Sequence, residues 1–177
     1  MESNLNQDLQ DFLPLLVRGL ETTLAITICA LALSIVLGFL WAWMGISRVT
    51  ALVWISRTVI NLVRGIPIIV QLFYVYFVLP ELGITLNAFA AGVVGLGLAY
   101  SVYQAENFRA GFNSVDHSLI EAAQSLGMPE GMILRRVILP LAVRIILPPF
   151  GNTSIMLLKD SSIASTITVT ELTRAGQ

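Results

Sequence analysis

Charged residues are scarce in this sequence: Lys, Arg, Asp and Glu make up 12% of its 177 residues, about half the share of ~25% that is usual in soluble domains. With 56% hydrophobic residues and a mean hydropathy of +0.82, the composition excludes an ordinary soluble domain and indicates an integral membrane protein. The formal net charge of −1 excludes a basic nucleic-acid binder and a strongly acidic tail.

Cysteine and histidine occur once each, which limits the chemistry that the chain supports. Cys29 lies in an apolar run, has no partner for an internal disulfide, and is expected to pack as a small hydrophobic residue. His117 is accompanied by no second histidine or cysteine, so no metal site is expected. The polar and acidic N-terminal tail does not resemble a secretory signal peptide.

Sequence motifs of common hydrolases are also missing. The sequence contains no G-x-x-x-x-G-K-[ST] phosphate loop, no G-x-S-x-G elbow and no H-E-x-x-H zinc motif. The chain is therefore not expected to be an enzyme.

Long apolar segments make up most of the sequence. The stretch from Thr22 to Ser47 carries no charge and would extend over ~39 Å as a helix, more than the ~30 Å hydrocarbon core of a bilayer. Pro67 is expected to kink or begin a second membrane helix, and Pro148 and Pro149 to distort a fourth unless neighbouring groups satisfy the freed backbone. Four transmembrane helices are predicted, over residues 22–47, 61–79, 86–104 and 138–158.

Small residues recur at helical spacing along two of these segments. They are Ala30, Ser34, Gly38 and Ala42 in the first, and Ala91, Gly95 and Ala99 in the third. Such stripes let helices approach closely in lipid, so both are expected to be packing surfaces. Trp41 and Trp43 near the end of the first segment are expected to lie at the membrane interface.

The distribution of charge predicts how the segments are oriented. Arg48, Arg57 and Arg64 follow the first segment without an acidic neighbour, whereas Glu81 is the only charge between the second and third. The tail ahead of the first segment is mainly acidic. Because cytoplasmic loops collect Lys and Arg, the N-terminus is predicted to lie outside and the 106–137 loop in the cytoplasm.

The 106–137 loop carries clear helix signals. Ser118 followed by Glu121 is typical of a capping box, which predicts a helix with Ser118 as its N-cap. Gly127 is placed to end that helix in a left-handed conformation, and Pro129 suits the first turn of a second short helix. Pro140 is then expected to bend the chain back into lipid. The loop is predicted to be a compact helix–turn–helix unit, packed either on its own chain or on a cytoplasmic partner.

The first helix of this unit has an apolar face formed by residues at i, i+3, i+4 and i+7, namely Leu119, Ala122, Ala123 and Leu126. The unit also resembles a DNA-binding helix-turn-helix, but Arg135 and Arg136 are nearly its only basic residues, so DNA binding is not expected. Glu106 and Arg109, three residues apart, predict an ion pair on the helix surface.

Three stretches carry a resemblance to a known family. The spacing E-A-A, three residues, Gly, nine residues, an aliphatic residue, one residue and Leu-Pro resembles the EAA signature of ABC importer permeases. In this chain the signature is formed by Glu121, Ala122, Ala123, Gly127, Val137, Leu139 and Pro140, with Val137 in place of the commoner Ile. "VRGIPIIVQLFYVYFVLP" from Val63 and "LLKDSSIASTITVTELTRAGQ" from Leu157 resemble the polar amino acid uptake branch, the permeases for residues such as histidine, glutamine, arginine or cystine.

The resemblance implies an all-α integral membrane protein, with one type I ABC importer-like transmembrane domain over residues 1–177. No cofactor is implied in this chain, because ATP and Mg bind to partner ATPase subunits, two per complex. The other implied partners are a second permease subunit, identical or homologous, and a periplasmic or extracytoplasmic amino-acid-binding protein. The implied location is the bacterial cytoplasmic (inner) membrane. Related permeases usually end with one more span, so a fifth is expected to be missing by truncation after Gln177.

The resemblance also gives the predicted unit a role. In such importers the EAA loop forms a coupling helix that docks in a cleft of an ATPase subunit, and closure of the two ATPase subunits drives alternating access. The residues implied to form the dock are Glu121, Ala122, Ala123, Leu126, Gly127, Met128 and Arg135.

Polar residues at membrane depth are the candidates for a substrate path. Lys159 and Asp160 form either an interfacial, mutually paired couple or, as the resemblance favours, a segment in which Asp160 attracts the α-amino group of an amino acid. The hydroxyls of Ser161 and Ser162 would guide the substrate. Weaker candidates, which are more often interhelical hydrogen bonds, are Gln71, Asn152 and Thr153. The alternative function is a passive channel, or an importer of another small polar solute.

Overall fold

The computed structural model describes residues 2–167 and 169, with side chains from Leu13 onward, and throughout this part every regular element is helical. The all-α class predicted from the sequence is confirmed. The long helices are α1 (Glu2–Gly45), α2 (Thr50–Gly65), α4 (Ala88–Asn113) and α7 (Leu139–Asp160). The short ones are α3 (Ile68–Phe73), α5 (His117–Ser125) and α6 (Glu130–Ile133). The acidic side chains of the N-terminal tail and residues 170–177, both used in the sequence-based predictions, lie outside the described residues.

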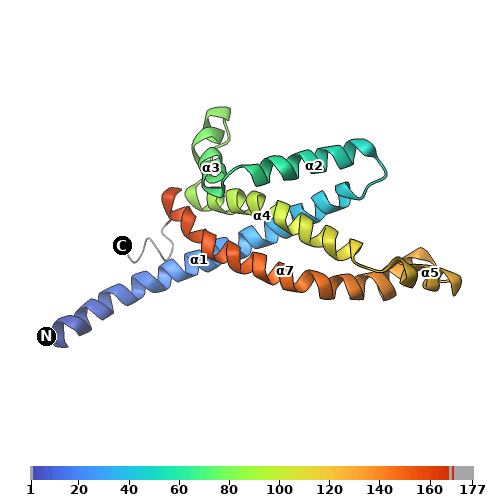
Figure 1. The fold of residues 1–177 in the computed structure, drawn as a ribbon. Coiled ribbons are helices and arrows are strands. Elements are labelled where there is room, and N and C mark those ends of the chain that lie inside the picture. The colour runs from blue at the N-terminus through green and yellow to red at the C-terminus, as the bar shows by residue number, and fades with distance from the viewer. Residues whose placement is uncertain (1, 168, 170–177) are drawn as a thin grey trace.

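The connections between the long helices gather at two ends of the molecule. Figure 1 shows α1, α4 and α7 crossing one another along most of their lengths, with α2 returning beside the C-terminal half of α1. The α1–α2 connection and α5 lie toward one end, and the start of α1, α3 and the end of α7 lie toward the other. The basic α1–α2 connection is therefore at the same end as the helix–turn–helix unit.

The most extensive packing in the fold is between α1 and α4. Ala30, Ser34, Gly38 and Ala42, the predicted small-residue stripe of α1, are all buried. A Cβ atom added to Gly38 would lie 2.7 Å from the Cβ atom of Gln104 and 2.8 Å from the carbonyl oxygen of Ser101, both on α4. The stripe therefore serves close helix packing, as predicted.

The second predicted stripe is buried on α4. Ala91, Gly95 and Ala99 face the main hydrophobic cluster, which also contains Leu72 of α3. A Cβ atom on Gly95 would lie 2.7 Å from Cδ1 of Leu72, so this glycine lets α3 rest directly on α4. The central position of α4 follows from two close contacts, one with the small-residue stripe of α1 and one between its own stripe and α3.

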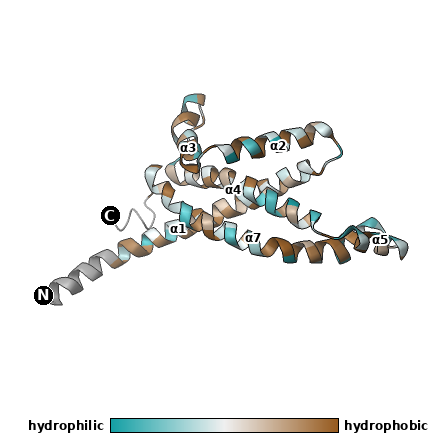
Figure 2. Ribbon diagram, in the orientation of Figure 1, coloured by the Kyte–Doolittle hydropathy of each residue, from teal (hydrophilic) through white to brown (hydrophobic). Residues whose placement is uncertain are grey.

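Large apolar side chains cover the outer surface of these helices, as Figure 2 illustrates by the brown segments of α1 and α7. By length and composition, Leu13–Gly45 and Ala88–Asn113 can each cross a membrane, and the bent pair Thr50–Gly65 and Ile68–Leu82 provides a third span if counted as one. The 22-residue α7, which carries Arg144 and ends on Lys159 and Asp160, is not among these candidate spans. A count of four spans stays a prediction.

Residues 61–79, predicted as the second transmembrane segment, do not form a single straight helix, and the prediction is corrected accordingly. The chain turns by 103° between α2 and the helical stretch that begins at Ile68. Pro67 is the N-cap of α3, so it begins a helix, and Ile66 before it is extended (φ −103°, ψ 128°). A residue that precedes proline is disfavoured in the helical region, which explains the break.

The helices on either side of the helix–turn–helix unit are longer than predicted. α4 continues to Asn113, and the chain remains helical from Glu130 to Asp160 through a π-helical turn at Leu134–Ile138. In this turn the Leu139 N–H donates to the Leu134 carbonyl oxygen, a wider spacing immediately before Pro140, which has no N–H to donate. Pro140 therefore lies in the first turn of α7, and the second short helix leads into α7 without a loop.

The Gly38 contact predicts the effect of a single substitution. Gly38→Val should destabilise the protein by about 1–3 kcal/mol, because the new side chain overlaps the α4 backbone. The measurement is the thermal unfolding midpoint of the purified protein in detergent. Gly151→Val on α7 is the matched control, because no atom lies within 4 Å of a Cβ added there. Equal midpoints for the two variants would contradict the assignment of Gly38 as the close contact.

Candidate functional site

The helix–turn–helix unit begins two residues earlier than the sequence predicts. The N-cap of α5 is Asp116, whose carboxylate accepts a hydrogen bond from the Ser118 N–H at 2.9 Å, so the prediction that Ser118 is the N-cap is wrong. This backbone hydrogen bond lowers the pKa of the Asp116 carboxyl. Glu121 does not complete a capping box but lies 3.2 Å from Nδ1 of His117, one turn before it on the exposed surface.

The end of α5 confirms the predicted role of Gly127. Gly127 has φ +73°, a left-handed conformation that glycine adopts without steric cost. Its N–H donates to the Gln124 carbonyl oxygen at 2.9 Å, and the Met128 N–H donates to the Ala123 carbonyl oxygen at 3.2 Å. This pair of bonds is a Schellman motif, which fixes the direction of the chain between α5 and α6.

The apolar face predicted for α5 is divided between the interior of the unit and its surface. Ala123 is buried at 5% exposure beside Ile133 of α6 at 3%, where the two helices contact each other. Leu126 is 81% exposed and Leu119 46% exposed, and the small side chain of Ala122 is also accessible. No other described part of the chain covers this outer face. Arg135 is exposed next to Pro129 and Met132, at the border of the unit.

At the opposite end of the fold, Asp160 is held by a tyrosine from another helix. The Tyr100 hydroxyl on α4 donates to Oδ2 of Asp160 at 2.6 Å, and Tyr100 itself is 1% exposed. Asp160 is half-buried, whereas its neighbour Lys159 is exposed. The carboxylate therefore turns inward from the end of α7, and the alternative of a Lys159–Asp160 pair has no contact among the described residues to support it.

The two serines that follow Asp160 hydrogen-bond locally. The Ser161 hydroxyl donates to the Leu158 carbonyl oxygen at 2.7 Å and the Ser162 hydroxyl to the Lys159 carbonyl oxygen at 2.8 Å. Ser161 is buried and Ser162 partly exposed. Because each hydroxyl hydrogen is donated to a carbonyl oxygen at the end of α7, only the lone pairs of the two hydroxyl oxygens remain available to a cationic ligand.

The three weaker candidates for the substrate path form hydrogen bonds within the protein. Nε2 of Gln71 donates to the carbonyl oxygens of Val63 and Ile66, each at 2.8 Å, and so pins the corner between α2 and α3. Asn152 is exposed and lies 3.9 Å from the Met156 sulfur. The Thr153 hydroxyl donates to the Pro149 carbonyl oxygen at 2.9 Å, inside the helix turn that the two prolines interrupt.

A polar cluster that the sequence analysis missed joins α4 to α7. Nδ2 of Asn107 donates to the Thr153 hydroxyl at 3.1 Å and to Oε1 of Gln104 at 3.2 Å. Gln104 is fully buried, and its Nε2 has no hydrogen-bond partner among the described residues. Gln104 and Asn107 are polar residues one turn apart in an apolar segment, and this spacing was the signal available in the sequence.

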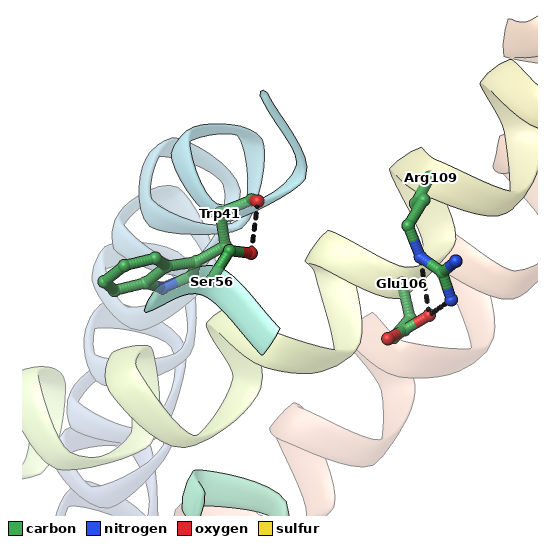
Figure 3. Close-up of polar contacts among 4 residues, drawn as sticks. All are labelled: Trp41, Ser56, Glu106 and Arg109. Carbon is green, nitrogen blue, oxygen red and sulfur yellow. Dashed lines mark hydrogen bonds and ion pairs between the residues drawn. The ribbon is translucent and has the colours of Figure 1, made fainter. Parts of the chain in front are cut away.

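Glu106 and Arg109 form the predicted ion pair on the outer face of α4, with the carboxylate 2.5 Å from one guanidinium nitrogen (Figure 3). Both side chains are partly exposed, which limits such a pair to ~0–1 kcal/mol of stabilisation. The pair borders a cavity between α1, α2 and α4.

The sequence matches a known family over most of its length. Residues 34–177 match the family described as binding-protein-dependent transport system inner membrane component. The chain is 38% identical to the probable amino-acid ABC transporter permease protein y4tG of Sinorhizobium fredii over 93% of its own length and 71% of that protein. It is 37% identical to the L-cystine transport system permease protein TcyB of Bacillus subtilis (95% and 72% covered) and 39% identical to the glutamine transport system permease protein GlnP of Escherichia coli (93% and 76% covered).

Solved structures agree with these relatives. The fold superposes on an amino acid ABC transporter, described as crystallised with histidines, with a TM-score of 0.87 and 39% identity, covering 95% of this chain and 78% of that one. An inward-facing MetNI methionine ABC transporter gives a TM-score of 0.71 at 25% identity, with 86% and 74% covered. In such transporters ATPase activity resides in a separate subunit and the permease functions together with a binding protein.

The long apolar helices and these matches agree on one assignment. The chain belongs to the binding-protein-dependent transport system inner membrane component family, and it is a multi-pass inner-membrane permease subunit of an ATP-driven amino-acid importer.

Proposed function

We propose that the surface of α5 and the turn after it is where a partner ATPase drives this permease. The observation that carries the proposal is the uncovered apolar face of α5, on which Leu126 is 81% exposed. The Schellman motif supports it, because a fixed turn transmits displacement better than a flexible loop. The proposed dock consists of Glu121, Ala122, Ala123, Leu126, Gly127, Met128 and Arg135, with Ala123 on the inner side of the unit.

The partners follow from this assignment. Two ATPase subunits bind ATP and Mg, and each docks on one permease subunit. A second permease, identical or homologous, completes the membrane part of the complex, and an extracytoplasmic binding protein delivers the amino acid. The α5 end of the fold faces the cytoplasm and the start of α1 faces outside, which the arginines Arg48, Arg57 and Arg64 support. α7 is the fourth span of this topology.

The substrate in this proposal is a polar L-amino acid, the class named for several relatives. Asp160 is the anionic group that meets the α-ammonium, and Tyr100 orients its carboxylate through the 2.6 Å hydrogen bond. Ser161 and Ser162 offer lone pairs beside it. Asn152 and Thr153 lie about two turns before Asp160 on α7, whereas Gln71 keeps a structural role at the α2–α3 corner.

Gly127 provides the first test of coupling. Gly127→Val should abolish ATP-driven uptake while the protein remains in the membrane, because a β-branched residue is strained at φ +73° and the turn must change. The measurement is amino-acid uptake into proteoliposomes that contain the complete transporter. Gly131→Val is the matched control, since Gly131 lies in α6 and no atom is within 4 Å of a Cβ placed there. Normal uptake by the Gly127 variant would rule out the assigned role.

Asp160 provides a test of the substrate path. Asp160→Asn should reduce the maximal uptake rate about tenfold or more, since a hydrogen bond to a charged group contributes ~1.5–3 kcal/mol. Lys159→Gln, an adjacent exposed change of charge, should have little effect. Basal ATP hydrolysis should be retained in both variants. If the Asp160 variant transports as the parent does, Asp160 does not contact the substrate.

The orientation is testable by labelling from one side of the membrane. With Cys29 replaced by serine, Leu126→Cys should react with a membrane-impermeant maleimide only after the cells are permeabilised. Glu81→Cys, near the opposite end of the fold, should react in intact cells. The reverse pattern would invert the proposed topology.

A further inference from the structure

A cavity between α1, α2 and α4 is used neither by the proposed dock nor by the proposed path. Its volume is about 280 Å³, far more than the ~10–15 Å³ that one water molecule needs. Polar side chains from all three helices line it: Trp41, Ser56, Arg57, Asn61, Glu106 and Arg109. It lies near the C-terminal ends of α1 and α4, toward the end of the fold that carries α5.

The walls of this cavity are held by contacts within the protein. The Ser56 hydroxyl on α2 donates to the Trp41 carbonyl oxygen on α1 at 2.8 Å, as the dashed line in Figure 3 marks. On α4, the Arg109 Nε lies 3.2 Å from the Glu106 carboxylate, and a second guanidinium nitrogen also contacts it. The cavity is therefore bounded by side chains that already have fixed positions.

Three hydrogen-bond donors around the cavity have no partner among the described residues. The indole N–H of Trp41 is buried and makes no hydrogen bond. The Arg57 guanidinium and the Asn61 amide, one turn apart on α2, are exposed and make no hydrogen bond or ion pair there. Because a buried donor is nearly always satisfied in proteins, the Trp41 N–H points to a ligand with acceptor atoms, and the two accessible donors beside it are free to bind the same ligand.

The charge of the cavity identifies the kind of acceptor. Arg57, Arg109 and Glu106 together leave one positive charge, which one phosphodiester group balances. The planar guanidinium of arginine binds phosphate oxygens in a two-pronged geometry. Of the two arginines, Arg57 has its donors available, and Arg109 keeps those not used by Glu106.

An apolar groove begins where this cavity ends. Arg109 also borders a second cavity of about 370 Å³, which is lined mainly by apolar residues such as Phe39, Trp43, Phe112 and Leu139. Phe39 and Phe112 continue into a third cavity of about 260 Å³ toward Phe150. One ligand can therefore place a phosphate beside Arg57 and Arg109 and a long apolar chain along Phe39 and Phe112.

We propose that this composite site binds a membrane phospholipid, with its phosphate in the polar cavity and one acyl chain in the apolar groove. Basic pockets between membrane helices are a recurrent way of binding lipid headgroups. Trp41 and Trp43 are the aromatic residues that the sequence predicts at the membrane interface, and a headgroup at this depth agrees with that prediction. The lipid fills the gap between α1, α2 and α4 and joins the three helices. The proposal is independent of the amino-acid path at Asp160.

The test is native mass spectrometry of the intact transporter complex, stripped of lipid in detergent and titrated with dioleoyl phosphatidylglycerol. One phospholipid per permease subunit should bind more tightly than any further lipid. Arg57→Gln should weaken this binding about fivefold, the effect of ~1 kcal/mol for one arginine near a lipid surface. Trp41→Phe, which keeps a ring but removes the N–H, should also weaken it. Arg48→Gln changes the same charge outside the cavity and should not.

The same titration separates the other possible occupants. Inorganic phosphate or a free polar amino acid, each added in excess, should leave the tight lipid in place. Displacement by phosphate would identify a soluble anion site, and displacement by an amino acid would identify a second substrate site; either result overturns the proposal. Equal lipid binding by Arg57→Gln and Arg48→Gln would also overturn the proposal. So would a complex that binds no lipid tightly, because its cavity would then hold only water.

Discussion

The close crossing of α1 and α4 is the contact on which the rest of the fold depends. In lipid, apolar burial gives helices little reason to associate, so short backbone distances and buried polar contacts must hold them together. Gly38 supplies the short distance, and it lies opposite Gln104, which is fully buried at the crossing. Through Asn107 the same residue is linked to Thr153 on α7. Three helices are thus fixed around one point on α4.

The two candidate functional regions lie at opposite ends of this frame, and they differ in how they are built. The α5 unit is stabilised by the side-chain cap of Asp116 and by the backbone hydrogen bonds around Gly127, and it presents apolar side chains outward. The Asp160 region is stabilised by a side-chain contact from Tyr100 and presents polar groups. A surface with exposed leucine suits a protein partner, whereas an oriented carboxylate suits a small cationic group, which agrees with the roles proposed for each.

Features with a local cause were predictable from the sequence, and features set by tertiary contacts were not. The small-residue stripes and the left-handed Gly127 follow from residue type and spacing alone, and both predictions are confirmed. The N-cap was misassigned because Asp116 and Ser118 are both good caps and only the helix register selects between them. The segment 61–79 was predicted as one span with a kink or a helix start at Pro67, but the 103° turn was not predictable because the apolar composition continues across the proline. The Tyr100–Asp160 contact joins residues 60 positions apart and leaves no periodic signal.

The absence of a loop between α6 and α7 has a mechanical consequence. Residues 130–160 form one rod of roughly 45 Å at ~1.5 Å per residue, with Arg135 near its beginning and Asp160 at its end. A rigid rod of this length that tilts by about 10° moves its far end by about 8 Å. The π-helical turn and the two prolines are the places along the rod where it is able to flex. A tilt of this kind would carry a small displacement from the Arg135 end of the rod to the Asp160 carboxylate at its other end.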